Sequence, residues 1–286
     1  MSSVDRSAAR SLGLVGDPAP GQSKLSVRGV AKSFPTARGG RIQALDDITF
    51  DVAPGEFVCL LGPSGSGKST VLNILAGLES PDGGEVLMNG RRVTGPGPDR
   101  AMLFQDPALF PWMTVQANVE FALRMVDVPA GERRDRARAW LAKVHLTRFA
   151  DVQPHELSGG MRQRAALARA LACRPEILLA DEPFGSVDAQ ARELLQVEVQ
   201  RVWAETGTTF VFVTHNVREA ALLADRVLLM SAAPGTLLEE YRIRAPRPRH
   251  LEDALLSRVV VDIHDRLSEE VSKVVARETG ERPDLA

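Results

Sequence analysis

The stretch FVCLLGPSGSGKST, residues 57–70, decides the fold. Its first five residues, Phe57 to Leu61, are all apolar, which is typical of a strand buried on both faces of a parallel sheet. The remaining nine match the pattern G-x-x-x-x-G-K-[ST], and a helix is expected from Lys68 to about Ala76. A buried strand that runs through a glycine-rich loop into a helix predicts an α/β protein built around a phosphate-binding loop.

The loop between this strand and this helix has the chemistry that a phosphate group requires. Glycines allow consecutive backbone N–H groups to point inward, and the helix N-terminus adds partial positive charge. Lys68 can reach the β- and γ-phosphates of a nucleotide, and the hydroxyl of Ser69 can ligate Mg²⁺. A flexible Gly/Ser linker is the alternative, but it does not explain why the buried strand runs directly into the loop. The expected binding residues of the loop are Gly62, Pro63, Ser64, Gly65, Ser66, Gly67, Lys68, Ser69 and Thr70.

The composition is that of an ordinary globular protein. Of 286 residues, 44% are hydrophobic and 25% are charged, and the formal net charge is −2. This excludes a mainly disordered, collagenous or disulfide-scaffold protein, and the charge balance argues against a nucleic-acid partner. The sequence has no apolar run of about 18 residues, so a membrane role would need spans from another chain. Cys59 and Cys173 lie in apolar stretches, which favours buried reduced thiols and a cytosolic location.

The rest of the chain alternates between strand and helix patterns on either side of a helical stretch. Residues 1–22 are expected to be a flexible tail. Helical patterns over 115–126 and 131–149 predict a helical subdomain at about 106–172, inserted into an α/β domain of residues 23–244. A C-terminal extension, 245–286, begins with a linker-like segment and continues as one or two amphipathic helices over 251–277. The other expected strands are 44–52, 85–88, 101–105, 177–180, 209–213 and 225–230, and the other expected helices are 158–172 and 188–205.

An acidic pair follows one of these strands. Ile177 to Ala180 are apolar, and Asp181 and Glu182 come directly after them. Ligands of parallel sheets bind at the carboxyl ends of the strands. Asp181 is therefore expected to hold Mg²⁺, directly or through water, and Glu182 to polarise an attacking water as a general base. Taken alone, the pair would more often be a solvated loop end; the phosphate loop favours the catalytic interpretation.

A second candidate anion site lies at Leu157 to Arg164, LSGGMRQR. Ser158 is a good N-cap, and Gly159 and Gly160 expose backbone N–H groups at the start of a helix. A protein with two such helix ends either binds two phosphates or shares one phosphate between two subunits. A plain helix cap is the alternative.

The segment resembles the LSGGQ signature of the ATP-binding cassette (ABC) ATPases, with Met161 in place of Gln. Further motifs of that family follow in order over residues 24–240. Phe34 lies where the family has its adenine-stacking aromatic, Gln105 matches the Q-loop, and His215 matches the switch histidine. Residues 185–188 (GSVD) match the D-loop, usually S-A-L-D, only in part. Each residue alone has a structural explanation, such as a core aromatic, a solvated strand end or a hydrogen-bonded histidine.

The resemblance implies a P-loop ABC ATPase fold: an α/β core with a mixed sheet, an antiparallel β part and a helical subdomain. It also implies a head-to-tail homodimer with two ATP molecules at its interface, each between one phosphate loop and the other subunit's signature helix. The implied catalytic residues are Glu182, His215 and Gln105, of which Gln105 links Mg²⁺ and the attacking water to the helical subdomain. The implied ATP-binding residues beyond the loop are Phe34, Ser158, Gly159, Gly160 and Asp188, and the implied Mg²⁺ ligands are Ser69, Gln105 and Asp181.

Softer motifs resemble the nitrate, sulfonate and taurine-type importers. These are GPGPDR at 95–100, LFPWMTV at 109–115, DEPFGSVD at 181–188 and PRPR at 246–249. The resemblance implies an ATP hydrolase that energises uptake of a small anion through two copies of an integral-membrane permease. A periplasmic or lipoprotein solute-binding protein would act indirectly, and the chain would lie on the cytoplasmic face of the inner membrane. Residues 107–115 are unusually apolar, and either receive a permease helix or pack between core and subdomain.

Three other functions compete with this interpretation. An ABC exporter or lipid-transport ATPase differs only in the softer motifs. Soluble ABC ATPases of DNA repair or translation usually carry a long coiled-coil insertion or tandem cassettes, and the sequence has neither. A P-loop kinase or GTPase would not need the signature or the switch histidine. A GTPase would also need the guanine-binding motif N-K-x-D, which the sequence does not contain.

Overall fold

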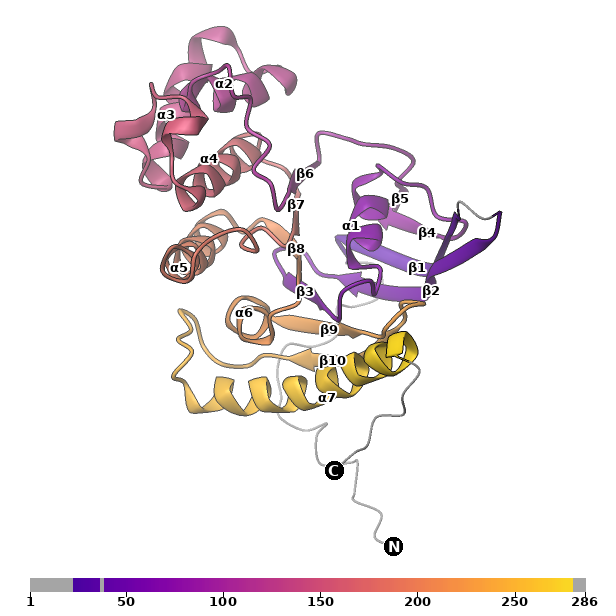
Figure 1. The fold of residues 1–286 in the computed structure, drawn as a ribbon. Helices are drawn as coiled ribbons and strands as arrows, with labels where there is room; N and C mark the ends of the chain where they lie inside the picture. The colour runs from indigo at the N-terminus through magenta and orange to yellow at the C-terminus, as the bar shows by residue number, and fades with distance from the viewer. Residues whose placement is uncertain (1–22, 37–38, 280–286) are drawn as a thin grey trace, which may run out of the picture.

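The computed structural model describes residues 23–36 and 39–279, so the expected tail at 1–22 lies outside the described residues. Two sheets and two layers of helices make up the fold (Figure 1). A six-stranded sheet has the order β10-β9-β3-β8-β7-β6, and all its pairs are parallel except β10 with β9. Its strands are β3 (Phe57–Leu61), β6 (Arg100–Leu103), β7 (Ile177–Asp181), β8 (Thr209–Thr214), β9 (Arg226–Met230) and β10 (Leu237–Arg242).

The second sheet is antiparallel, with the order β2-β1-β4-β5. Its strands are β1 (Leu25–Pro35), β2 (Arg41–Val52), β4 (Gly83–Met88) and β5 (Arg91–Arg92). A mixed sheet beside an antiparallel sheet confirms the predicted fold class. The strand β3 and the helix α1 (Lys68–Ala76) have the bounds that the sequence predicts.

The central sheet is covered on both faces. On one face, α1 packs between the two sheets; on the other lie α4 (Gly159–Ala172), α5 (Ala189–Thr206) and α6 (Val217–Leu223) (Figure 1). Every residue of β3, β8 and β9 is buried, which explains why these strands are apolar without alternation. The carboxyl ends of β3, β7 and β8 therefore meet at one edge, where the site lies.

Helices α2 (Val115–Met125) and α3 (Ala130–Lys143) pack on α4 around their own apolar cluster. Two expectations in and beside this region were wrong in detail. The helix expected over 131–149 ends at Lys143, because His145 has a φ of 56°, and a short 3₁₀ turn, Thr147–Phe149, follows. The strand expected over 101–105 ends at Leu103, so Gln105 lies two residues beyond it. The sequence also did not predict α6 or β10.

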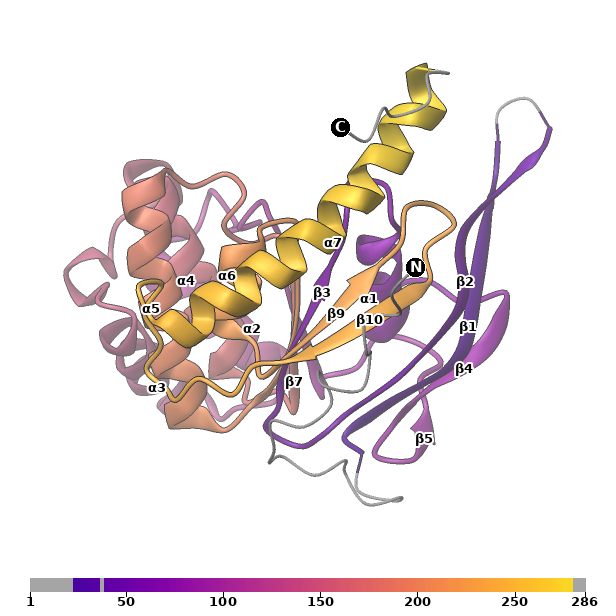
Figure 2. The same cartoon turned by 90° about the horizontal axis from the view of Figure 1, so that it is seen from below.

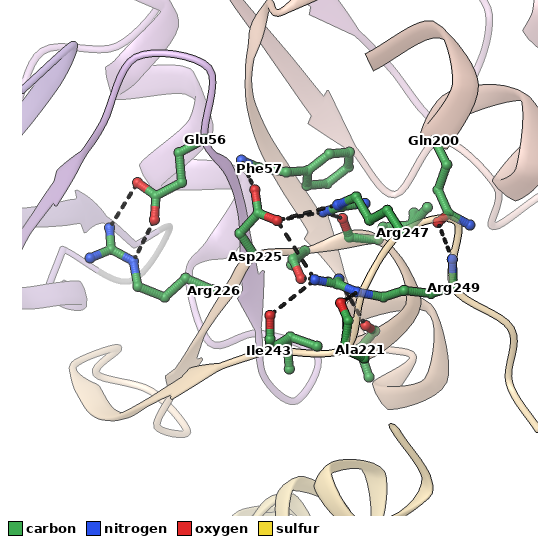
Figure 3. A network of polar contacts seen from close by, with 12 residues as sticks. Glu56, Phe57, Gln200, Ala221, Asp225, Arg226, Ile243, Arg247 and Arg249 are labelled. Carbon is green, nitrogen blue, oxygen red and sulfur yellow. Dashed lines mark hydrogen bonds and ion pairs between the residues drawn. The ribbon is translucent and has the colours of Figure 1, made fainter. Parts of the chain in front are cut away.

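The segment after β10 is not a linker, although its composition suggested one. The guanidinium of Arg249 is buried and donates to the backbone carbonyls of Ala221, Ala224, Ile243 and Ala245 (Figure 3). Burial lowers the pKa of Arg249 to about 10. Arg247 stacks on Trp203 at 4.1 Å and pairs with Asp225 at 2.8 Å. These arginines attach the C-terminal part of the chain to α6, because they satisfy carbonyl groups at the end of that helix.

The helix α7 (Ala254–Thr279) follows, where one or two amphipathic helices were expected. It runs beside α6 and across β9 and β10 (Figure 2). None of the helices in the described ranges, 23–36 and 39–279, is both long and apolar enough to cross a bilayer.

Candidate active site

The phosphate loop turns tightly between β3 and α1. Gly65 and Gly67 have φ values of 76° and 85°, which side chains rarely adopt. A Cβ atom on Gly67 would also lie 2.5 Å from Cδ2 of Leu45 on β2. Gly67 is the N-cap of α1, so the loop brings its backbone to the positive end of the helix dipole. Gly67 thus serves close packing as well as the turn, whereas Gly65 serves the turn alone.

Lys68 lies inside this loop. Its side chain is buried, and Nζ donates to the carbonyls of Gly62 (2.9 Å) and Pro63 (2.8 Å) and approaches Oγ of Ser66 (3.3 Å). Burial lowers the pKa of Lys68, and the nearby carboxylates of Glu182 and Asp181 partly oppose that shift. A buried ammonium group at a helix N-terminus is the arrangement that holds polyphosphate anions.

Ser69 and Asp181 meet across the edge of the sheet. Oγ of Ser69, in the first turn of α1, donates to Oδ1 of Asp181 at the end of β7, over 3.0 Å. Burial raises the pKa of Asp181, while the bond from Ser69 lowers it. In the described part of the chain no group of three or more His, Cys, Asp or Glu could hold a metal ion. One hydroxyl and one carboxylate instead fit Mg²⁺, which takes few protein ligands and completes its shell with water and phosphate oxygens.

Glu182 and His215 form a pair beside this edge. Oε2 of Glu182 lies 2.9 Å from Nδ1 of His215, which follows the end of β8. Glu182 has a φ of 42°, and its N–H donates to the carbonyl of Val213 on β8. This unusual backbone turns the carboxylate out of the strand direction and toward His215; such strain is typical of functional positions. A cavity of about 50 Å³, lined in part by Glu182, Gly185 and His215, is large enough for a water molecule.

Gln105, two residues beyond the end of β6, places its side chain beside Gly185 in the turn that follows Glu182. A Cβ atom on Gly185 would lie 3.0 Å from Nε2 of Gln105 and 3.3 Å from the carbonyl of Glu182. The structure therefore brings all three expected catalytic residues to one turn. Among the described residues, no hydrogen bond joins the Gln105 side chain to Ser69 or Asp181, the other two expected Mg²⁺ ligands.

The signature segment faces a different neighbour. Ser158 caps α4 by accepting from the N–H of Met161 (3.3 Å), and a Cβ on Gly160 would lie 3.0 Å from that of Ala191. Asp188 caps α5 by accepting from the N–H of Ala191 (2.9 Å). Gly159 is open: an added Cβ would meet nothing closer than 4.0 Å. Among the described hydrogen bonds, none joins residues 158–160 to residues 62–70.

Phe34 lies near the end of β1. Its ring is 37% exposed, and Nζ of Lys32 lies 5.4 Å from the ring centroid. Ile42, opposite it on β2, is also exposed. Leu45 on the same strand contacts Gly67, so this sheet adjoins the phosphate loop. Phe34 is therefore an exposed aromatic residue on the sheet that adjoins the phosphate loop. Among the described residues, its ring contacts Lys32 and not the phosphate loop.

One neighbour of the phosphate loop was missed from the sequence. Gly235, between β9 and β10, approaches so closely that a Cβ on it would lie 2.1 Å from the carbonyl oxygen of Ser66. Its N–H donates to the carbonyl of Ala44 and its carbonyl accepts from the N–H of Asp46, both over 2.9 Å. Pro234-Gly235 is a turn signal, but nothing in the sequence places that turn against a loop about 170 residues earlier.

An exposed aromatic surface lies at the start of α2. Trp112 is 70% exposed, and its ring centroid lies 5.5 Å from that of Phe110. Phe110 is fixed by residues of α2: its backbone N–H donates to Oδ1 of Asn118 (2.7 Å), and its ring packs on Phe121 with 4.8 Å between the ring centroids. The segment after Gln105 therefore uses Phe110 for internal packing and presents Trp112 outward.

Comparisons with known proteins agree with these geometries. A family model described as ABC transporter matches residues 45–185. The nitrate import ATP-binding protein NrtD of Synechocystis sp. is 47% identical over 207 residues, which is 72% of this chain and 78% of that protein. The taurine import ATP-binding protein TauB of Roseobacter denitrificans is 44% identical over 219 residues, 77% of this chain and 82% of that protein.

A solved structure with the same fold is a dimer. It is a post-hydrolysis state of an ATP-binding cassette bound to ADP and Pi, with a TM-score of 0.68 and 34% identity. The match covers 78% of this chain and 100% of that one.

Proposed function

This chain belongs to the ABC transporter family and is an ATP hydrolase, and we propose that it energises an importer of a small anion such as nitrate, a sulfonate or taurine. The observation that carries the catalytic part is the convergence of Lys68, Asp181 and the Glu182–His215 pair at one edge of the sheet. The transport part is supported by the similarity to NrtD and TauB, whose names state nitrate and taurine import.

ATP binds with its phosphates in the loop at residues 62–70. Lys68 and the backbone N–H groups at the start of α1 hold the negative charge, and Phe34 stacks on the adenine from the antiparallel sheet. Ser69 and Asp181 hold Mg²⁺, with Gln105 as a further ligand. When bound, Mg²⁺ neutralises phosphate charge as the terminal bond breaks.

Hydrolysis depends on Glu182 and His215. Glu182 accepts a proton from the attacking water, and the residue lines a cavity large enough for that water. His215 holds that carboxylate in place through Nδ1 and contacts the γ-phosphate through its other ring nitrogen, Nε2. Gln105, packed on the Gly185 turn, connects the water position to the segment that leads into the helical subdomain.

The complete site is formed by two copies of the chain. Gly160 packs against Ala191 at the start of α5, Ser158 caps its own helix and Gly159 is open, so the signature is available to a second chain's nucleotide. The dimeric cassette of the same fold supports this assembly. ATP then joins the subunits, with Asp188 near the shared interface, and hydrolysis separates them.

The motion of the dimer acts on a partner in the membrane. We assign the permease contact to the surface around Trp112, because this residue is apolar, exposed and lies a short distance beyond Gln105 in the chain. Two permease copies match a homodimer. A periplasmic or lipoprotein solute-binding protein delivers the solute, and this chain sits on the cytoplasmic face of the inner membrane.

The test is to purify the tagged chain from gently solubilised native membranes and identify its partners by mass spectrometry. A multi-span permease encoded with a solute-binding protein is the expected result, and that binding protein is then screened against nitrate, taurine and alkanesulfonates. A permease with no binding protein would favour an exporter. Ribosomal or DNA-repair partners without any membrane protein would overturn the transport function and leave the ATP hydrolase.

A further inference from the structure

One helix outside the nucleotide-binding core buries an acidic side chain. The inward face of α7 carries Leu256 and Ile263, both fully buried, and seven residues further along the same face it carries Glu270, 2% exposed. Over residues 254–273, where the side chains of α7 are described, Glu270 is the one buried charged group. An apolar residue would serve packing better at this position, because burial of a carboxylate is costly unless its partners compensate.

The carboxylate of Glu270 has such partners. Oε2 accepts from the backbone N–H of Ala232 over 3.3 Å, and Oε1 pairs with Nζ of Lys273 one turn further along α7. Ala232 belongs to the β9–β10 loop, residues 231–236, and is itself buried. This loop is closed on itself, since Ser231 and Thr236 exchange backbone and side-chain hydrogen bonds. Glu270 therefore attaches a compact loop to α7.

Gly235, in the same β9–β10 loop, packs against the phosphate loop. Gly235 has no room for a side chain against the carbonyl of Ser66, and its two backbone bonds fix it to Ala44 and Asp46. Between those two residues, Leu45 fills the space beside Gly67. A continuous series of contacts thus runs from Glu270 through the β9–β10 loop to Ser66 and Gly67, the two residues that precede Lys68.

We propose that Glu270 is a positioning residue for nucleotide binding, which makes α7 part of the ATP-binding apparatus of this chain. The proposal rests on the proposed function, since it takes the phosphate loop as the ATP site. Without the carboxylate, Ala232 loses its acceptor and the β9–β10 loop its attachment to α7. The phosphate loop then has to be ordered by ATP itself, and the cost of ordering appears as weaker binding.

The test compares Glu270→Ala with Glu270→Gln in the full-length chain, with Glu269→Ala as the matched control. Gln retains an oxygen that accepts from Ala232, whereas Ala does not; Glu269 is the adjacent, exposed glutamate, which pairs with Arg266. ATP affinity is measured by equilibrium titration, KM and kcat by phosphate release, and the order of residues 62–68 by hydrogen exchange. All measurements are made well below the melting temperature of each variant.

We expect Glu270→Ala to weaken ATP binding and raise KM by about threefold to tenfold, the range for the loss of one typical hydrogen bond, with kcat changed less than about twofold. Exchange at residues 62–68 should rise, and Glu270→Gln and Glu269→Ala should stay near the wild type. Wild-type ATP affinity and exchange in Glu270→Ala would overturn the proposal, even if its melting temperature fell. So would an equal loss in Glu269→Ala. A wild-type chain that failed to bind ATP would instead refute the proposed function.

Discussion

Nδ1 of His215 lies 2.9 Å from Oε2 of Glu182, and the two residues directly follow the neighbouring parallel strands β8 and β7. Their pairing is a consequence of sheet order, because adjacent parallel strands end at the same edge. The positive φ of Glu182 completes it by turning the carboxylate toward the histidine.

Replacement of Glu182 by Gln should separate ATP binding from hydrolysis. The amide keeps the shape and the contact with His215 but is not basic, so phosphate release should fall by at least about 100-fold while ATP still binds. Because the proposed mechanism has hydrolysis separate the subunits, the variant should accumulate as an ATP-bound dimer. Light scattering with MgATP measures the dimer, and Glu132→Gln, an exposed glutamate of α3, is the control. A monomer with MgATP would contradict the expected mechanism.

Removal of Mg²⁺ should abolish hydrolysis reversibly. Chelation with EDTA should stop phosphate release, and added Mg²⁺ should restore it. In Asp181→Asn the hydroxyl of Ser69 keeps a partner but the site loses its carboxylate, so the Mg²⁺ concentration for half-maximal activity should rise by at least about tenfold. An unchanged Mg²⁺ dependence in that variant would show that Asp181 does not hold the metal.

Trp112 should matter to the permease and not to the nucleotide. In Trp112→Ala, recovery of the permease with the tagged chain should fall, because a large exposed aromatic is lost from the contact surface. ATP affinity should stay within about twofold, since Phe110 and its bond to Asn118 still hold the segment. Met125→Ala, another exposed apolar residue of the helical subdomain, is the matched control. Equal permease recovery with the wild type, Trp112→Ala and Met125→Ala would show that Trp112 is not part of the permease contact.

Arg249 should be needed for stability. Arg249→Ala removes the guanidinium that donates to four backbone carbonyls and pairs with Asp225. The free energy of unfolding should therefore fall by about 3–5 kcal/mol. The exposed neighbour Arg244 provides the control, and its replacement by Ala should cost less than about 0.5 kcal/mol. Urea unfolding of both variants measures the difference. Similar losses at the two positions would contradict the role assigned to the buried guanidinium.

The sequence predicted the local features of the site well and the long-range ones poorly. The phosphate loop, β3 and α1 follow from chemistry within one short segment, so their bounds were correct. The approach of Gly235 to Ser66 joins segments far apart in the chain, and no local pattern specifies it. The linker predicted around Arg249 was wrong for the same reason. The composition of a Pro/Arg-rich segment favours a solvated linker, and the carbonyl groups at the end of α6 that bind Arg249 are not visible in the local sequence.

Each proposed ATP site combines the phosphate loop of one subunit with the signature of the other, and an experiment that mixes two variants tests this arrangement. Lys68→Ala disables the phosphate loop. Gly159→Asp places a carboxylate at the signature, where an added side chain meets no close neighbour. Each variant alone should be inactive.

Mixed together, the two variants should regain part of the wild-type ATPase activity. Each heterodimer has one site made of an intact phosphate loop and an intact signature, whereas no single subunit has both. Recovery of activity on mixing is the predicted result. Activity in Gly159→Asp alone, or no recovery from heterodimers shown to form, would contradict the shared site.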